Sequence, residues 1–176
     1  MRKFIGAAAL AAFVGLGAVA MPAGGAAAGP IRTVEFTGTS TFQILAGGCS
    51  LIEQSHDATL ATNRGDTIHI EGCVDLFGGS TPNFPYAGTF TIDSPGRRSI
   101  TGTVSGEVGG PPAGTCPGDL GGSAITFELT PVRDGRRPHD PAAPMHLAGT
   151  WCSPGVPDVP GPIFGTLTGQ LPPAMH

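Results

Sequence analysis

One short phrase recurs five times in this chain of 176 residues: Gly-Thr, one further residue, and then Ser, Thr or Cys. The copies begin at Gly38, Gly88, Gly102, Gly149 and Gly165. In each copy the Gly shares its parity with the large apolar residues nearby, whereas the Thr occupies the alternate positions. A period of two is the pattern of a β-strand with one buried face. The phrase therefore predicts a protein built from strands.

The same alternation, interrupted by Gly, Pro, Asn and Asp, predicts eight strands and no helix. Their ranges are 33–45, 57–62, 67–75, 86–93, 99–108, 123–130, 145–152 and 163–171. Every mid-strand Gly falls on the apolar face, where it allows a strand to bend and a sheet to close, and the opposite face carries Thr, Ser, Glu, Gln and His. We predict an all-β fold, an eight-stranded antiparallel up-and-down barrel, and we keep a two-sheet β-sandwich as the alternative.

The N-terminus has the features of an export signal. Arg2 and Lys3 precede an apolar run rich in Ala, Gly and Leu, and small residues follow it. We predict cleavage after Ala28, with Ala20 as the alternative, so that residues 29–176 form a single secreted domain. Removing the only lysine and one arginine moves the net charge from −4 to −6. An acidic surface without lysine argues against nucleic acid or an anionic membrane as partner.

Four cysteines in an exported chain are expected to form two disulfides rather than a zinc site, because no C-x-x-C pair is present. Cys73 and Cys152 lie near the ends of the predicted strands 67–75 and 145–152. Cys49 and Cys116 lie upstream of the preceding predicted strands, 57–62 and 123–130. Pairing of neighbouring strands favours Cys49–Cys73 and Cys116–Cys152. The other two connectivities stay open, since sequence alone does not decide between them.

The order of several phrases supports a resemblance to a known group of proteins. These phrases are GTSTF at 38–42, GDTIHIEGC at 65–73, YAGTFTID at 86–93, ITGTVSGEV at 100–108 and FGTLTGQL at 164–171. The chain resembles exported bacterial proteins of unknown function that are related to the allene-oxide-cyclase-like barrels. The resemblance implies a small calycin-like barrel. It implies no cyclase activity, because no catalytic motif of that family can be matched residue by residue.

Three segments carry residues that have chemical uses elsewhere. His69, Glu71, Cys73 and Asp75 alternate along one strand and could form a metal or acid–base site, but a solvated outer face explains them more simply. Arg64-Gly65-Asp66 matches an integrin-binding tripeptide and is also typical of a hairpin turn, which we favour. The loop 131–144, rich in proline and charge, is expected to be a solvated connection.

The inward-facing aromatic residues give the first hypothesis for function, which is non-catalytic binding of a small apolar molecule inside the barrel. The predicted lining residues are Phe36, Phe42, Tyr86, Phe90, Phe127 and Trp151. The alternatives are an extracellular interaction or inhibitor module that acts through its long loops, and an enzyme of unknown type. The sequence contains neither G-x-S-x-G nor H-E-x-x-H. We expect no metal or cofactor, and a monomer.

Overall fold

The computed structural model describes residues 30–44, 49–50, 53–79, 82–132 and 143–170. The strands are β1 (Arg32–Ile44), β2 (Glu53–Thr62), β3 (Thr67–Asp75), β4 (Asn83–Asp93), β5 (Ile100–Gly109), β6 (Gly121–Pro131), β7 (Met145–Ser153) and β8 (Gly161–Gly169). Within the described residues, no helix has the length and hydrophobicity that a membrane span requires. The predicted signal peptide, residues 1–28, lies outside the described part of the chain.

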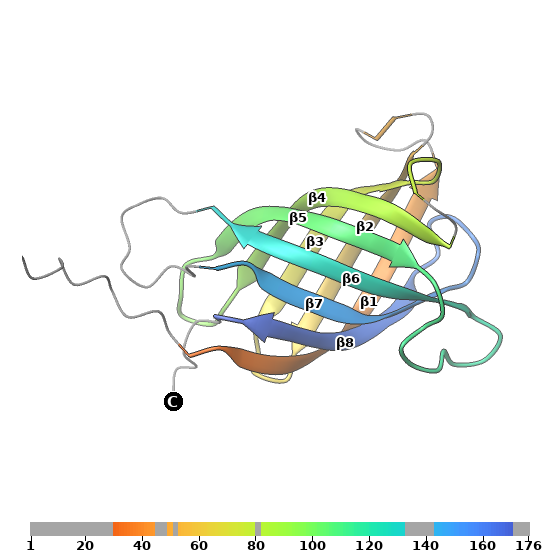
Figure 1. The fold of residues 1–176 in the computed structure, drawn as a ribbon. Helices are drawn as coiled ribbons and strands as arrows, with labels where there is room; N and C mark the ends of the chain where they lie inside the picture. The colour runs from red at the N-terminus through yellow and green to blue at the C-terminus, as the bar shows by residue number, and fades with distance from the viewer. Residues whose placement is uncertain (1–29, 45–48, 51–52, 80–81, 133–142, 171–176) are drawn as a thin grey trace, which may run out of the picture.

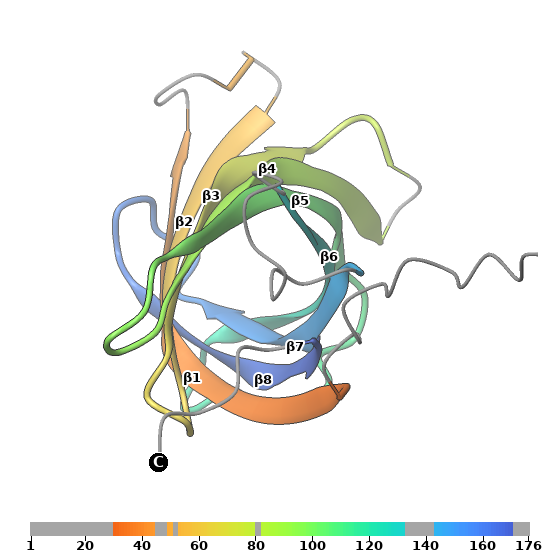
Figure 2. The same cartoon turned by 90° about the vertical axis from the view of Figure 1, so that its left-hand side faces the viewer.

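The eight strands form a closed antiparallel barrel (Figures 1 and 2). Each strand pairs with the next one along the chain, and β8 returns to pair with β1, where Phe36 lies opposite Gly165. The barrel predicted from the alternation is therefore confirmed, and the sandwich alternative is wrong. The predicted strand ends mostly agree to within three residues, but β2 begins at Glu53, four residues before the predicted start.

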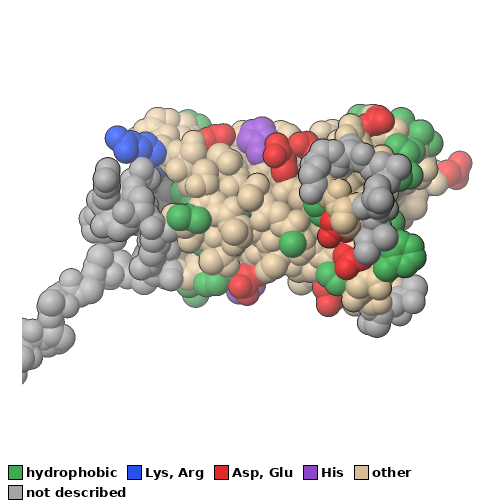
Figure 3. Space-filling view, turned by 90° about the horizontal axis from the view of Figure 1, so that it is seen from above, with side chains coloured by type: hydrophobic (Ala, Val, Ile, Leu, Met, Phe, Trp, Pro, Cys, Tyr) green, Lys and Arg blue, Asp and Glu red, His purple; other side chains and the backbone are tan. Residues whose placement is uncertain are grey.

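The side chains that point inward form one hydrophobic core along the barrel axis. Its buried members are Val34, Phe36, Phe42, Ala58, Leu60, Ile68, Ile70, Val74, Tyr86, Phe90, Ile92, Val104, Val108, Ile125, Phe127, Leu129, Met145, Leu147, Trp151, Ile163 and Leu167. The outer face is polar: the side of the barrel seen in Figure 3 consists mostly of uncharged polar side chains and backbone, with few charged groups between its two ends. The alternation thus separates core from surface along the strands, as expected for a half-buried sheet.

Two inward-facing glycines show how the wall of the barrel bends. Gly72 on β3 and Gly88 on β4 lie directly opposite each other. A Cβ atom at Gly88 would lie 2.1 Å from the carbonyl oxygen of Glu71, and one at Gly72 would lie 2.5 Å from that of Ala87. Neither contact is sterically allowed, so only glycine permits the two backbones to approach in this way.

The two ends of the barrel differ. At one end, β2 connects to β3 through a tight turn in which Gly65 has a φ of +84° and the amide of Asp66 donates to the hydroxyl of Thr62 at 3.1 Å. The side chain of Asp66 is 7% exposed, so this tripeptide serves as a turn, as favoured above. The next hairpin turn closes at the same end, where the amide of Arg97 donates to the carbonyl of Ser94 at 3.0 Å.

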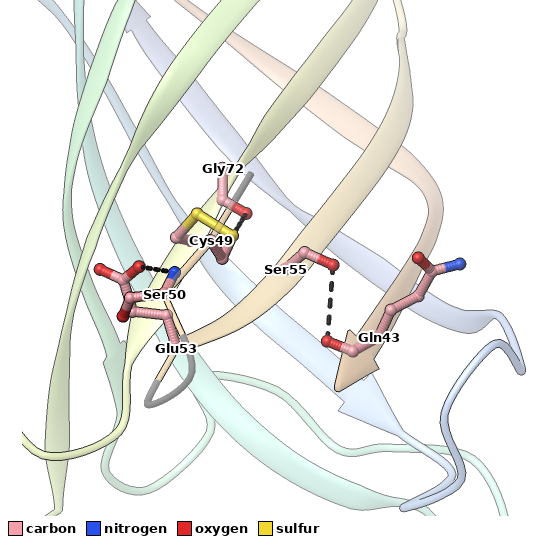
Figure 4. The surroundings of a disulfide bond; sticks show 7 residues. Gln43, Cys49, Ser50, Glu53, Ser55 and Gly72 are labelled. Atoms are coloured by element: carbon pink, nitrogen blue, oxygen red, sulfur yellow. Dashed lines mark hydrogen bonds between the residues drawn. A yellow bond between two sulfur atoms is a disulfide. The ribbon is translucent and has the colours of Figure 1, made fainter. Parts of the chain in front are cut away.

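The opposite end, which we call the disulfide end, carries both disulfide bonds. They are Cys49–Cys73 and Cys116–Cys152, which confirms the predicted pairing. Each bond holds a loop against the outside of the wall; Figure 4 shows the first of them beside β3. Cys152 is fully buried although it faces outward, and the amide of Gly114 in the covering loop donates to the hydroxyl of Thr150 at 2.7 Å.

Candidate functional site

All six aromatic residues predicted to line the interior are buried there. They are Phe36, Phe42, Tyr86, Phe90, Phe127 and Trp151, each between 2% and 7% exposed. Four of them approach the disulfide end and are joined by ring contacts. Phe42 meets Trp151 edge-on at 5.9 Å between ring centroids, and Tyr86 stacks on Phe127 at 4.5 Å. The other two lie elsewhere in the core; Phe36 pairs with Thr62, at the hairpin end of β2.

A buried histidine connects the two aromatic pairs. His56 points inward from β2 and is 3% exposed. Its ring meets Tyr86 edge-on at 5.6 Å and Trp151 edge-on at 4.9 Å between centroids. Its Nε2 atom makes a 2.5 Å hydrogen bond with the hydroxyl of Ser40, which also points inward. We refer to Ser40, His56, Tyr86 and Trp151, with Phe42 and Phe127 beside them, as the polar–aromatic cluster.

Three polar atoms of this cluster have no hydrogen-bond partner among the described residues. They are Nδ1 of His56, the hydroxyl oxygen of Tyr86 and Nε1 of Trp151. Proteins pair nearly all of their buried polar groups, because an unpaired one costs about 1–3 kcal/mol. Here three such atoms belong to rings that contact one another. The cluster is therefore an exception that needs an explanation.

Glycine creates the space that the cluster occupies. Gly72 lies directly opposite His56 across the β2–β3 ladder. A Cβ atom at Gly72 would lie 2.7 Å from the hydroxyl oxygen of Tyr86 and 2.8 Å from its Cζ atom. The tyrosine ring therefore extends over β3 only because this position has no side chain. The same glycine that lets the wall bend also admits the phenol to the interior.

Burial keeps both titratable groups of the cluster neutral. Desolvation lowers the pKa of His56 from 6.5 to about 4, so the imidazole is uncharged at neutral pH. Desolvation raises the pKa of Tyr86, and the carboxylates of Asp57 and Glu71 raise it further. These two carboxylates lie opposite each other on the outer face of β2 and β3. The phenol is thus a neutral donor or acceptor.

A pocket of about 530 Å³ lies on the outside of the same stretch of wall. It is lined mostly by outward-facing residues of β1 to β4 and by the Cys49–Cys73 disulfide, and Asp57 and Glu71 contribute its carboxylates. Three inward-facing positions, His56, Gly72 and Gly88, also border it. Figure 4 shows one edge of this region, where the hydroxyl of Ser55 donates to the carbonyl of Gln43 at 3.4 Å. His56 thus belongs both to the inner cluster and to the border of the outer pocket.

The rim of the disulfide end carries several exposed apolar side chains, with acidic side chains between them. Ile44, Leu76, Phe77, Val156 and Val159 are each at least 41% exposed, and all of them lie where strands end or begin at this end. In Figure 3, hydrophobic side chains gather at the right-hand end of the barrel. The β7–β8 loop is held against the end of β1 here, because the amide of Asp158 donates to the main-chain carbonyl of Phe42 at 2.9 Å.

The outward row on β3 is a solvated face, as favoured above. His69 lies 3.2 Å from the hydroxyl of Thr59 and 4.0 Å from the carboxylate of Asp93. Asp75 accepts hydrogen bonds from the amides of residues 77 and 78 at 2.9 and 2.8 Å, so it stabilises a turn. One group of potential metal ligands is present among the described residues, Cys49, Glu53 and Cys73, but both of its sulfur atoms are consumed by the disulfide.

Comparison with known protein families, with curated proteins and with solved structures finds no match to this chain. The resemblance to allene-oxide-cyclase-like barrels therefore stays a prediction. The loop 131–144 lies largely outside the described residues, so its expected role is also untested.

Sequence reasoning missed the two polar members of the cluster on β1 and β2. Because β2 was expected to begin at residue 57, His56 fell outside every predicted strand. Ser40 was not assigned to the interior, although it occupies the inward parity between Gly38 and Phe42. The expectation that Ser and His would all face outward is wrong at these two positions. The signal that could have found His56 is its spacing of two from Ala58 and of four from Leu60, which puts it on the same face of the strand as these two buried residues.

Proposed function

We propose that the barrel binds one small, largely apolar ligand in its interior, at the disulfide end, without chemical conversion. The observation that carries this proposal is the set of three buried polar atoms, on His56, Tyr86 and Trp151, that have no partner among the described residues. A binding site is typically a mostly apolar enclosure with a few polar groups that fix the orientation of the ligand. The polar–aromatic cluster has this composition.

The fold supports the same proposal. An eight-stranded barrel encloses an interior that side chains can fill or that can hold one small ligand. At the disulfide end, aromatic rings supply the apolar surface, and the exposed apolar side chains of the rim offer a route of entry from solvent. The disulfides hold the loops against the wall at this end, so these loops keep their shape without a large core behind each one.

Trp151 allows a direct test, because it is the only tryptophan in the chain and belongs to the cluster. The oxidised protein is titrated with cyclohexane and with cyclohexanol, neither of which absorbs at the excitation wavelength of tryptophan. We expect a saturable change in Trp151 emission at a stoichiometry of one, and a rise in melting temperature. A ligand at one hundred times its dissociation constant adds about 2.7 kcal/mol to the free energy of unfolding.

The matched control is Phe77→Ser, which removes an apolar side chain that is 76% exposed on the rim. It should leave the dissociation constant of both probes unchanged. The proposal fails if neither probe changes the emission or the melting temperature up to its solubility limit, or if Phe77→Ser abolishes the change, since the probe would then bind on the outside.

A further inference from the structure

We infer that the ligand of the interior site is electrically neutral and carries an oxygen atom that accepts hydrogen bonds from the polar–aromatic cluster. This inference rests on the proposed function and adds the chemical class of the ligand. It follows from what the three unpartnered atoms can do and from which charges their surroundings exclude. A purely apolar ligand would leave all three atoms unpaired, at the full cost of their desolvation.

The hydrogen-bonding capacity of the cluster favours an acceptor. The indole N–H of Trp151 can only donate, so the ligand atom that faces it must accept. The hydroxyl of Tyr86 can donate or accept. When Ser40 donates to Nε2 of His56, Nδ1 carries the proton and becomes a third donor; in the other tautomer Nδ1 accepts. A hydroxyl or carbonyl oxygen satisfies Trp151 in both cases, and a hydroxyl can also donate to Nδ1.

Charged ligands are disfavoured by the same surroundings. Burial lowers the pKa of His56, because desolvation disfavours a positive charge at this place. A ligand ammonium would meet the same penalty, because Asp57 and Glu71, the carboxylates that act on Tyr86, lie on the exposed outer face and attract it too weakly to replace its hydration. An anion would find no cationic side chain among the cluster residues. It would also be repelled by Asp57 and Glu71, whose charges already act on Tyr86 through the wall.

The rest of the ligand is expected to be a compact apolar ring. Phe42 contacts the ring of Trp151 and Phe127 stacks on the ring of Tyr86, so apolar surface lies next to two of the unpartnered polar atoms. A single six-membered ring with one oxygen is therefore a suitable probe. Cyclohexanol, cyclohexane, cyclohexanecarboxylate and cyclohexylammonium share the same ring and differ only in the group that faces the cluster.

The test measures the dissociation constants of these four compounds by isothermal titration calorimetry. We expect cyclohexanol to bind at least tenfold more tightly than cyclohexane and more tightly than either ion. In Tyr86→Phe, which keeps the ring and removes one oxygen, and in Trp151→Phe, which replaces the indole by a smaller ring without a donor, the preference for cyclohexanol over cyclohexane should fall about tenfold. Ile92→Val, a core substitution near the opposite end of the barrel, should leave the ratio of the two dissociation constants unchanged.

The outcomes separate this inference from the proposed function. If cyclohexane binds as tightly as cyclohexanol, or if either ion binds most tightly, the inference is overturned and interior binding stands. If the preference for cyclohexanol is the same in Tyr86→Phe and Trp151→Phe as in the unmodified protein, the oxygen lies elsewhere and the inference is again overturned. If none of the four compounds binds, both proposals are overturned.

Discussion

Replacing Tyr86 by phenylalanine removes one buried oxygen and leaves the aromatic ring in place. The hydroxyl has no partner among the described residues, and the side chain is 2% exposed. Deleting an unpaired buried hydroxyl recovers about 1–3 kcal/mol of desolvation cost. Loss of its contacts over Gly72 offsets part of this gain. We therefore expect Tyr86→Phe to raise the free energy of unfolding of the ligand-free protein by about 1 kcal/mol and the melting temperature by about 2–4 °C.

The assay is urea and thermal unfolding of the oxidised, ligand-free protein, followed by circular dichroism. Tyr86→Leu is the control, because it removes the ring that stacks on Phe127 and should lower stability. A gain in stability together with weaker binding of cyclohexanol is the pattern of a group kept for ligand rather than for folding. The reasoning is refuted if Tyr86→Phe lowers the free energy of unfolding by 1 kcal/mol or more, since the hydroxyl would then have a partner inside the protein.

Two further predictions concern stability. The unfolded chain takes up a proton on a histidine of pKa 6.5 while folded His56 stays neutral down to about pH 4, so unfolding should become easier as pH falls through this window, by about 3 kcal/mol in all. Urea titrations at several pH values should show this loss in the unmodified protein and in His146→Ala, an exposed control, but not in His56→Leu; an equal loss in His56→Leu would contradict it. Gly72→Ala should destabilise the barrel by about 2 kcal/mol or more, because its Cβ would overlap Tyr86 and the carbonyl of Ala87. Gly121→Ala, where the nearest atom would be 3.7 Å away, should change stability by less than about 0.5 kcal/mol, and equal effects in the two variants would rule out this account of the wall.

The fold could be predicted from the sequence because separate features of the sequence all indicated a barrel. The alternation of apolar and polar residues predicted the strands, and the glycines on the apolar face predicted which side of the sheet is concave. Neighbouring strands bring Cys49 to Cys73 and Cys116 to Cys152, so the hairpin order favoured the disulfide pairing that the structure shows, although sequence alone left the other two connectivities open. These are local rules, and a closed barrel in which every strand pairs with its neighbour obeys them throughout.

The functional site was only half predictable, for a physical reason. Its aromatic members lie on strands with a clear alternation of apolar and polar residues, and this alternation predicts that they face inward. Ser40 and His56 are polar residues at inward positions, which the hydrophobic pattern assigns to the surface. Their burial becomes reasonable only when Tyr86 and Trp151, 30 and 95 residues after His56, meet around the imidazole. Contacts between strands this far apart depend on closure of the barrel, which alternation within a single strand does not describe.

The indole N–H resonance of Trp151 gives the most direct test of the central claim. Because the chain has one tryptophan, its single indole cross-peak in a nitrogen–proton correlation spectrum needs no assignment. We predict that saturating cyclohexanol shifts this proton downfield and slows its exchange with solvent, as a new hydrogen bond to oxygen requires, whereas cyclohexane does neither. An indole proton that responds identically to both compounds, or to neither, would contradict the claim that the barrel holds an oxygen-bearing ligand against the polar–aromatic cluster.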